Sequence, residues 1–535
     1  MIRDQLAAAI SSALADLGLD VPADRVQLER PANLDHGDWS TNVVMANAKK
    51  AGRNPRELAQ ELTDRLLADP PPGVTTVEIA GPGFVNFRLD DSWLLTVLEA
   101  VIAKGEAGYA RTNFGQGQRV NVEFVSANPT GPLHAGHARG ACYADSVARL
   151  LERTGHNVSR ENYLNDRGVQ MKHFAASLAA RKAGEPVPED GYRGDYIAEW
   201  AAEMPADADP LEWGYARALA DHESTLSRIN IHFDTWFSER SLVEAGAIER
   251  TLADLRERDV VFEEEGASWL RSTDYGDDKD RVLVKSNGDL TYITPDIAYH
   301  RDKFDRGFDL VIDVWGADHH GYVPRMRAAL QCLGHDPTEF EVRITQLVRL
   351  MRAGKEVRMS KRTGDLISVD EIIDATSADA ARFTYLLQSV DSSQVFDFDA
   401  VAAQTMDNPV YYVQMAHARA CSIIRNAAEK GFERQPLEQA DRGLLGTERE
   451  LDVLRALFEL PGIVELASRE RAPHRVTNWS REMAAAFHGF FHDCYVVGDG
   501  VSPELTQARL WLTEAARIGL VISLDLLGVS APERL

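Results

Sequence analysis

Cysteine is scarce in this chain of 535 residues, and its spacing matches no metal or disulfide site. No two cysteines stand three positions apart, as a Cys-x-x-Cys pair would require. Neither a zinc site built on such pairs nor a disulfide framework is therefore indicated. Scattered cysteines are typical of a reducing compartment, so we expect a cytoplasmic protein. The four lie at Cys142, Cys332, Cys421 and Cys494.

Long apolar runs are absent as well. No stretch stays apolar over the length that a transmembrane helix needs, which is about 20 residues. The first residues, Met-Ile-Arg-Asp, lead into an amphipathic segment that lacks the pattern of a signal peptide. We therefore expect no membrane partner.

Positive charge is in deficit, because 58 Lys and Arg residues face 83 Asp and Glu residues and give a net charge of −25. This balance argues on its face against a nucleic-acid binder, but net charge governs solubility and steering more than local contacts. Residues 351–363 are locally basic, with a single acidic residue, so a nucleic-acid partner is not excluded. Their cations are Arg352, Lys355, Arg358, Lys361 and Arg362.

The length exceeds what one hydrophobic core serves, and about three domains are expected. Residues 1–110 mix helix and strand patterns and predict a small α+β domain. Residues 111–375 alternate strands with helices, which predicts a parallel sheet with crossover helices. A polar, largely helical insertion at about 172–260 interrupts that alternation. Residues 376–535 predict an all-α bundle, because apolar residues recur with helical period in 408–428, 444–468, 476–496 and 506–527.

Residues 121–137 predict a buried strand, a turn rich in proline and glycine, and the start of a helix over 136–151. A helix N-terminus offers free N–H groups and the positive end of the helix dipole, which suit a phosphate. His134 and His137 stand three residues apart and therefore share one face. Taken alone, this pattern is more typical of a capped helix that binds nothing.

A second segment, Val357-Arg-Met-Ser-Lys-Arg-Thr-Gly364, changes that balance. His134-Ala-Gly-His137 together with Met359-Ser-Lys361 resembles the two signatures of class I aminoacyl-tRNA synthetases. Two departures are visible. Ala135 stands where the general signature has isoleucine, and Arg358 and Arg362 replace the first lysine and the last serine of the second signature.

Longer segments resemble one family of that class, the arginyl-tRNA synthetases, and the resemblance covers essentially the whole chain. It implies a Rossmann-like class I catalytic domain at 111–375, an additional tRNA-contacting α+β domain at 1–110, and an α-helical anticodon-binding domain at 376–535. The segments that carry it are 122–134, 165–170, 315–321 and 407–419, with 36–38, Asn42 and 80–86 near the N-terminus.

The resemblance implies that the carboxylate of L-arginine attacks the α-phosphate of ATP, and that a terminal hydroxyl of tRNA(Arg) then attacks the arginyl-adenylate. Such an enzyme works by positioning and by stabilising charge. Mg²⁺ is expected to accompany ATP, and no metal held by the protein is expected, although Asp318, His319 and His320 could also suggest a metal site. The implied catalytic residues are His134, His137 and Lys361. The implied ATP-binding residues are Pro132, His134, Gly136, His137, Asp318, His319, Met359, Ser360 and Lys361.

Recognition of arginine needs a carboxylate that meets the guanidinium fork to fork. We expect Asp296 in the first turn of a helix, with Thr294 as N-cap and Pro295 at the first helical position, where the dipole keeps it ionised. The same pattern is also ordinary charge placement at a helix start. Glu123 lies on an apolar strand, and a cationic substrate would offset its burial. The implied arginine-binding residues are Glu123, Ser126, Asn128, His137, Tyr163, Asp166, Gln170, Tyr292 and Asp296.

The resemblance also implies tRNA contacts at both ends of the chain, where unpaired bases stack on aromatic rings and guanidinium planes. It further implies a monomer that binds tRNA before it activates arginine. Two alternatives stay open: a cysteinyl-type class I synthetase, although clustered zinc ligands are absent from the sequence, and a regulatory tRNA-binding paralogue without catalysis. The implied tRNA-binding residues are Asn42, Phe84, Asn86, His417 and Arg419.

Overall fold

The computed structural model describes residues 2–31, 36–357 and 367–535, which fall into two compact units. One unit contains Met1–Tyr109, Arg419–Glu459 and Ala485–Gly519, and the other contains Ala110–Ala418, Leu460–Ala484 and Leu520–Leu535. Among the described residues, no helix is both long and apolar enough to cross a membrane.

The first unit is built on a three-stranded antiparallel sheet with the strand order β1-β3-β2. Residues 74–80 form a strand, and the turn after it has positive φ at both of its glycines, Gly81 and Gly83. Asn54 caps α3 by accepting from the N–H groups of Arg56 and Glu57. The elements are α1 (Ile2–Asp16), β1 (Trp39–Thr41), α2 (Val43–Ala51), α3 (Pro55–Ala68), β2 (Val74–Ala80), β3 (Phe84–Leu89) and α4 (Ser92–Gly108).

Four long helices form the C-terminal part of the chain, and they confirm the expected helical bundle. Parts of them complete the first unit, where the rings of Trp39 and Trp93 pack edge-on against Phe458 at centroid distances of 5.9 and 4.7 Å. The Tyr109 hydroxyl donates to the Leu457 carbonyl. The helices are α16 (Pro409–Glu429), α17 (Glu448–Glu470), α18 (His474–Asp493) and α19 (Pro503–Leu526).

The second unit is built on a five-stranded parallel sheet with the order β11-β10-β4-β5-β6. The chain adds β5 and β6 on one side of β4 and later adds β10 and β11 on the other side. The strand order therefore reverses between β4 and β10, where open α/β sheets bind their ligands. The strands are β4 (Arg119–Glu123), β5 (Asn157–Leu164), β6 (Thr235–Ser238), β10 (Leu310–Gly316) and β11 (Phe340–Thr345).

Helices cover this sheet on both faces. The expected helix after the first strand is α5 (Ala135–Arg153), whose small alanine and glycine residues allow close packing. A core of buried apolar side chains joins three further helices to the sheet, including Leu255, Ile297, Val311 and Met326. These helices are α10 (Ala247–Glu257), α11 (Ile293–Asp305) and α12 (Val323–Cys332).

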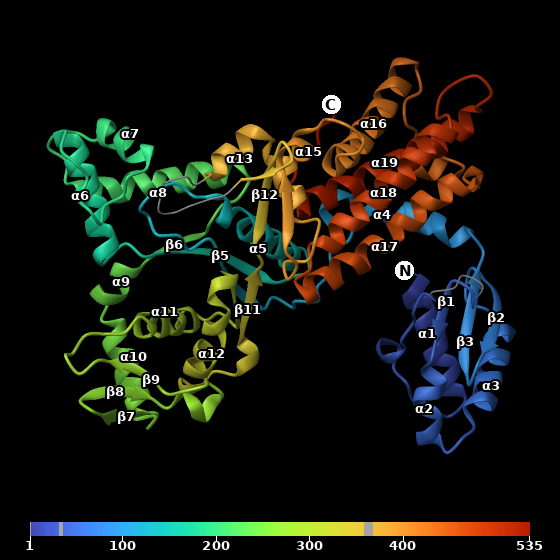
Figure 1. Cartoon of the computed structure of the whole chain (residues 1–535). Coiled ribbons are helices and arrows are strands. Elements are labelled where there is room, and N and C mark those ends of the chain that lie inside the picture. Colours follow the sequence, from blue (N-terminus) through green and yellow to red (C-terminus); the bar gives the residue numbers. More distant parts are fainter. Residues whose placement is uncertain (1, 32–35, 358–366) are drawn as a thin grey trace. The chain divides into compact units, whose positions relative to one another are not determined.

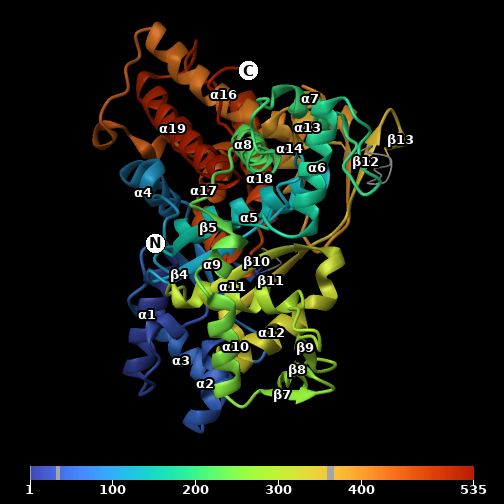
Figure 2. The same ribbon diagram turned by 90° about the vertical axis from the view of Figure 1, so that its left-hand side faces the viewer.

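The expected insertion at 172–260 is helical at first but then returns to the sheet, because β6 at 235–238 is a strand of it. In both views the insertion helices lie on one side of the sheet, opposite α10 and a small antiparallel sheet (Figure 1, Figure 2). The insertion helices are α6 (Val169–Ala183), α7 (Asp195–Glu203) and α8 (Pro210–Arg228), and α9 (Glu239–Glu244) follows β6. The small sheet contains β7 (Val261–Glu264), β8 (Ala267–Leu270) and β9 (Arg281–Val284).

The sequence pattern at 342–350 predicts one strand, but the structure breaks it into two strands of different sheets. β11 ends at Thr345, and the next strand pairs in parallel with a later strand instead of continuing the central sheet. The remaining elements are β12 (Val348–Arg352), β13 (Lys355–Glu356), α13 (Val369–Ala375), α14 (Ala378–Tyr385), β14 (Gln394–Asp397) and α15 (Phe398–Ala402).

Candidate functional site

The chain leaves β4 through two consecutive residues with left-handed backbone, Val125 at φ +68 and Ser126 at φ +42. This conformation is rare for a β-branched residue such as valine, and such strain persists only where the surroundings impose it. Its result is a fixed hydroxyl: Ser126 Oγ donates to Glu123 Oε1 at 2.7 Å and accepts from the Tyr163 N–H at 3.3 Å. The turn thereby joins the ends of β4 and β5.

The two histidines meet at the start of α5, and their expected common face is confirmed by a ring distance of 3.9 Å. His134 is the N-cap residue, and its Nδ1 accepts from the Gly136 N–H at 3.2 Å. His137 Nδ1 in turn accepts from the His134 N–H at 3.3 Å. A Cβ at Gly136 would lie 2.9 Å from the His134 ring, so the close approach of this cap requires glycine.

The expectation of free N–H groups at this helix start is wrong. The N–H of Ala135 donates to the Ile367 carbonyl at 2.8 Å, and that of His137 donates to the His134 carbonyl at 2.9 Å. With the Gly136 N–H bound to His134, the first three N–H groups of α5 are all occupied. A phosphate here would therefore meet imidazole rings before it met helix N–H groups.

The segment that leads into α13 pairs with the residues in front of α5. Val369 donates its N–H to the Leu133 carbonyl at 2.9 Å, and His134 forms an antiparallel bridge with Ser368. Ser368 also caps α13 by accepting from the Glu371 N–H. The second signature, Met359, Ser360 and Lys361, lies outside the described residues, as do Arg358 and Arg362.

The helix that carries Asp296 begins earlier than expected. α11 starts at Ile293, and Thr294 is not its N-cap, because its hydroxyl donates to the Leu283 carbonyl of β9 at 2.8 Å. Asp296 is partly buried and accepts from the Tyr322 hydroxyl at 2.6 Å. Burial raises the pKa of Asp296 above its ordinary value, although the hydrogen bond from Tyr322 lowers it. Tyr292, one turn earlier, is 93% exposed.

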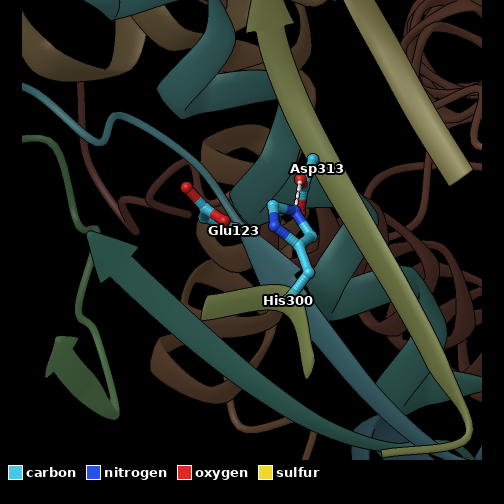
Figure 3. A group of neighbouring side chains, drawn as sticks. All are labelled: Glu123, His300 and Asp313. Carbon is cyan, nitrogen blue, oxygen red and sulfur yellow. Dashed lines mark hydrogen bonds and ion pairs between the residues drawn. The ribbon is translucent and has the colours of Figure 1, made fainter. Parts of the chain in front are cut away.

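Four charged residues, Glu123, His300, Lys303 and Asp313, form a buried cluster close to the backbone of Asp296. Figure 3 shows three of them, Glu123, His300 and Asp313. The sequence predicted only Glu123 as a site residue. The Lys303 ammonium bonds both to Glu123 and to Asp313, the latter at 3.0 Å. The argument that Glu123 needs a cationic ligand is therefore wrong, since Lys303 already supplies the cation. Burial raises the pKa of Glu123, whereas the charges of Lys303 and His300 outweigh burial and lower that of Asp313.

His300 faces acceptors through both ring nitrogens. Its Nε2 lies 2.7 Å from Asp313 Oδ2, and its Nδ1 lies 2.8 Å from the backbone oxygen of Asp296. Because neither acceptor carries a hydrogen to donate, both nitrogens must, and the ring is an imidazolium. Burial opposes this charge, but the Asp313 carboxylate outweighs it and raises the pKa of His300.

Ligand atoms of Glu123, His300 and Asp313 lie within 4.8 Å of one another, as in a metal site. The Lys303 ammonium already bridges the two carboxylates, however, and the imidazolium has no lone pair for a metal. The residues present do not fit a metal ion. The cluster instead holds two positive and two negative side chains and supports the backbone of Asp296.

Three carboxylates gather around Tyr163 at the end of β5. Burial and the charges of Glu239, Asp296 and Glu123 all raise the pKa of its hydroxyl, which places these acids close to it. The ring packs against Tyr299 at 4.5 Å. Glu239, the first residue of α9, was also missed by the sequence interpretation. Such a group of acids beside aromatic rings suits a cation.

Other predicted pocket residues divide into two groups. Asn128 and Gln170 meet at the surface, with Asn128 donating to Gln170 Oε1 at 2.6 Å. Asp166 is buried and accepts from Ser238 Oγ at 2.5 Å and from the Arg240 N–H at 3.1 Å. Asp166 therefore anchors the start of α9, and its carboxylate is committed to the protein.

The residues predicted for the nucleotide flank the switch point between β4 and β10. Pro132 is half-buried in the turn before α5. Asp318 and His319 are exposed on a short 3₁₀ helix, Ala317–Tyr322, that directly follows β10, and their side chains lie 3.6 Å apart. Since Asp313 of β10 pairs with Glu123 of β4, the ends of both strands lie at the same edge of the sheet.

The residues predicted to contact tRNA differ in how far their side chains are exposed to solvent. Phe84 is exposed, and Asn42 is half-buried at the start of α2, whereas Asn86 is 6% exposed and accepts from Ser40 Oγ at 2.7 Å. His417 is 2% exposed and bonds to the Pro532 carbonyl, which leaves no free face for a base. The Arg419 guanidinium is half-buried and stacks on Phe491 at 4.8 Å.

Three family models match the chain. The arginyl tRNA synthetase N terminal domain matches residues 4–89, the catalytic domain of class I (R) tRNA synthetases matches residues 97–189 and 209–424, and the DALR anticodon binding domain matches residues 413–535. The arginine–tRNA ligase of Frankia alni is 46% identical across 100% of this chain and 99% of its own. That of Moorella thermoacetica is 44% identical across 99% and 97%.

Solved structures agree with these matches. A putative arginyl-tRNA synthetase from Campylobacter jejuni is 31% identical, covers 84% of this chain and 100% of its own, and has a TM-score of 0.75. The Thermus thermophilus arginyl-tRNA synthetase has a TM-score of 0.77 over 100% of both chains. At 24% identity, the latter likeness shows the fold alone.

Proposed function

The chain belongs to the arginyl-tRNA synthetase family, and from this premise we propose which residues join L-arginine to tRNA(Arg). It is an ATP-dependent arginine–tRNA ligase of class I, so the cysteinyl-type alternative and the non-catalytic paralogue are set aside. Along the sequence, its Rossmann-like catalytic domain follows an N-terminal domain and precedes a helical DALR domain. The boundaries 1–110, 111–375 and 376–535 are proposed for these three domains.

The observation that carries the arginine site is the group of acids around Tyr163 at the end of β5. Asp296 is proposed to meet the guanidinium, with Tyr322 holding its carboxylate in place. Tyr163, Tyr292 and Glu239 would line the same pocket. Arginine would lower the pKa of Asp296 by placing a further cation beside this partly buried carboxylate.

Glu123 and its neighbours are assigned a different part of the substrate. With Lys303 bound to one carboxylate oxygen and Ser126 to the other, Glu123 keeps only its remaining lone pairs for arginine. We assign Glu123, Ser126, Asn128 and Gln170 to the backbone end of arginine, beside the histidines. Asp166 acts behind them, by fixing the start of α9.

ATP is proposed to lie along the start of α5. The rings of His134 and His137 would donate to its phosphate oxygens, Gly136 and Pro132 would allow the close approach, and Asp318 and His319 would face the adenosine. Lys361, with Met359 and Ser360, would stabilise the departing pyrophosphate. Mg²⁺ would arrive with ATP, and the arginine carboxylate would attack the α-phosphate in this setting.

The tRNA is proposed to contact both ends of the chain. Phe84 and Asn42 offer the accessible groups in the N-terminal domain, and Arg419, stacked on Phe491, offers a guanidinium plane in the helical domain. The buried side chains of Asn86 and His417 would act there only by supporting their neighbours. We further propose that the enzyme is a cytoplasmic monomer and that it must bind tRNA before it activates arginine.

ATP–pyrophosphate exchange with each of the standard amino acids, with and without tRNA, tests the specificity. We expect exchange with arginine alone and a strong requirement for tRNA. Exchange supported by another amino acid and not by arginine would refute the assignment. Exchange with arginine at full rate without tRNA would remove only the tRNA requirement.

His137→Asn tests the role of the helix start. Asparagine can keep the cap, because its side-chain oxygen accepts from a backbone N–H as the imidazole does. The exchange rate should nevertheless fall by about 10²-fold, the usual effect of losing one donor to a developing charge. His492→Asn, which changes an exposed histidine, is the matched control. A rate equal to that of the control would remove His137 from the reaction.

A further inference from the structure

One face of the insertion helix α8 is bonded to two distant segments of the chain. His222 Nε2 donates to the Gly131 carbonyl at 2.8 Å. Thr225 Oγ1 donates to Asp370 Oδ2 at 2.5 Å, and the Arg228 guanidinium bridges Asp370 and Asp374 of α13. These three residues of α8 follow one another at intervals of three, so they point to one side of the helix.

The two segments that α8 holds are the flanks of the proposed ATP site. Gly131 precedes Pro132 and His134 in the turn before α5, and a second insertion residue, Tyr196 of α7, donates to the Thr130 carbonyl at 2.9 Å. Asp370 lies in the first turn of α13. The backbone between these flanks is already paired, through Leu133 with Val369 and through Ala135 with Ile367.

Stability alone does not account for the Arg228 bridge. Its side chain is 39% exposed and that of Asp374 is 68% exposed, and ion pairs at such positions contribute little to folding. The planar guanidinium, however, spans two carboxylates one turn apart and so fixes the position of α13 against α8. Helix α8 carries a second arginine that bonds two carboxylates, Arg217, whose partners are Glu203 and Asp221. Both partners belong to the insertion, so these ion pairs contact neither flank of the proposed ATP site.

We propose that Arg228 and Thr225 are positioning residues for the ATP step of the reaction. By holding α13 on α8, they set the backbone pairing of Leu133–Ala135 with 367–369, and through it the place of His134 and His137. The insertion is then part of the catalytic machinery, although none of these α8 residues touches substrate. This inference rests on the proposed function, since it assigns a role in arginine activation.

The test compares Arg228→Ala with Arg217→Ala in the full-length chain, using arginine-dependent ATP–pyrophosphate exchange with tRNA present. Arg228→Ala should lower the rate or raise the KM for ATP by tenfold or more, because small displacements of reacting groups are costly. The KM for arginine should stay within about twofold, and the thermal midpoint within about 3 °C of wild type. Arg217→Ala should leave all of these values unchanged.

Asp374→Asn removes the more exposed of the two carboxylates that Arg228 bonds. This second variant tests the inference even if Arg228→Ala folds poorly. In this variant too, the rate should fall or the KM for ATP should rise, while the KM for arginine stays nearly unchanged. Arg228→Lys should have part of the rate that Arg228→Ala loses. Equal behaviour of the Arg228 and Arg217 variants, or equal losses for ATP and arginine, would overturn the inference. A wild-type chain without arginine-dependent exchange would instead refute the proposed function.

Discussion

Replacing Lys303 with methionine is expected to destabilise the catalytic region by about 3–5 kcal/mol. Methionine has nearly the length of lysine but no charge, so Glu123 and Asp313 would stay buried with only His300 to oppose them. Breaking a buried ion pair from one side leaves an uncompensated charge, and that cost exceeds the loss of the contact itself. Urea unfolding of the full chain, followed by tryptophan fluorescence, measures the change.

Two comparisons make this prediction specific. Lys182→Met removes an exposed lysine of α6 and should change the unfolding free energy by less than about 0.5 kcal/mol. Adding Asp313→Asn to Lys303→Met should recover part of the loss, because the two sites interact and their effects are not additive. If Lys303→Met unfolds at the same urea concentration as Lys182→Met, the cluster does not carry the charge balance described here.

The second large effect is on substrate. Asp296→Asn should lower kcat/KM for arginine by about 10²–10³-fold, since removing one partner of a buried charged pair costs about 2–5 kcal/mol. The amide would also turn N–H donors toward a guanidinium that has no acceptor. Steady-state exchange at varied arginine concentration, with ATP saturating, gives the value.

Other variants separate this loss from general damage to α11. Asp305→Asn changes an exposed carboxylate of the same helix and should have no effect. Tyr322→Phe removes the hydroxyl that orients Asp296 and should cost about tenfold, because hydrogen bonds to charged groups contribute about 1.5–3 kcal/mol. A KM for ATP that rose as much as that for arginine would place Asp296 outside the arginine pocket.

Much of the fold follows from periodicity in the sequence. Apolar residues at intervals of 3.6 predicted α16–α19 with bounds that differ by a few residues from those observed. The strand before His134 and the helix after it were also predicted, because proline and glycine mark the boundary between them. The prediction that Thr294 is the N-cap of α11 was wrong, although threonine is a favoured N-cap residue. Its hydroxyl is bonded instead to the carbonyl of Leu283, which lies in β9.

The partners of Glu123 could not be predicted in the same way. Lys303 stands 180 positions away, and it reaches Glu123 only because β10 pairs with β4 on the side where the strand order reverses. A signal did exist, since Asp296, His300 and Lys303 are spaced by four and three residues and share a helix face. Asp313, like Glu123, interrupts an apolar strand. Each of these patterns can be recognised in the sequence by itself. That they come together in space depends on the order of the strands in the sheet.

The division of the chain into two interleaved units bears on its synthesis. The unit that begins at Ala110 also includes Leu520–Leu535, where the Leu527 and Ser530 carbonyls accept from Arg382 and Gln414. A nascent chain that has emerged only as far as residue 418 therefore lacks one hydrogen-bond acceptor of each of these two buried side chains, which keep their bonds to Asp145 and Asp379. This unit cannot complete its packing until residues near 530 have left the ribosome.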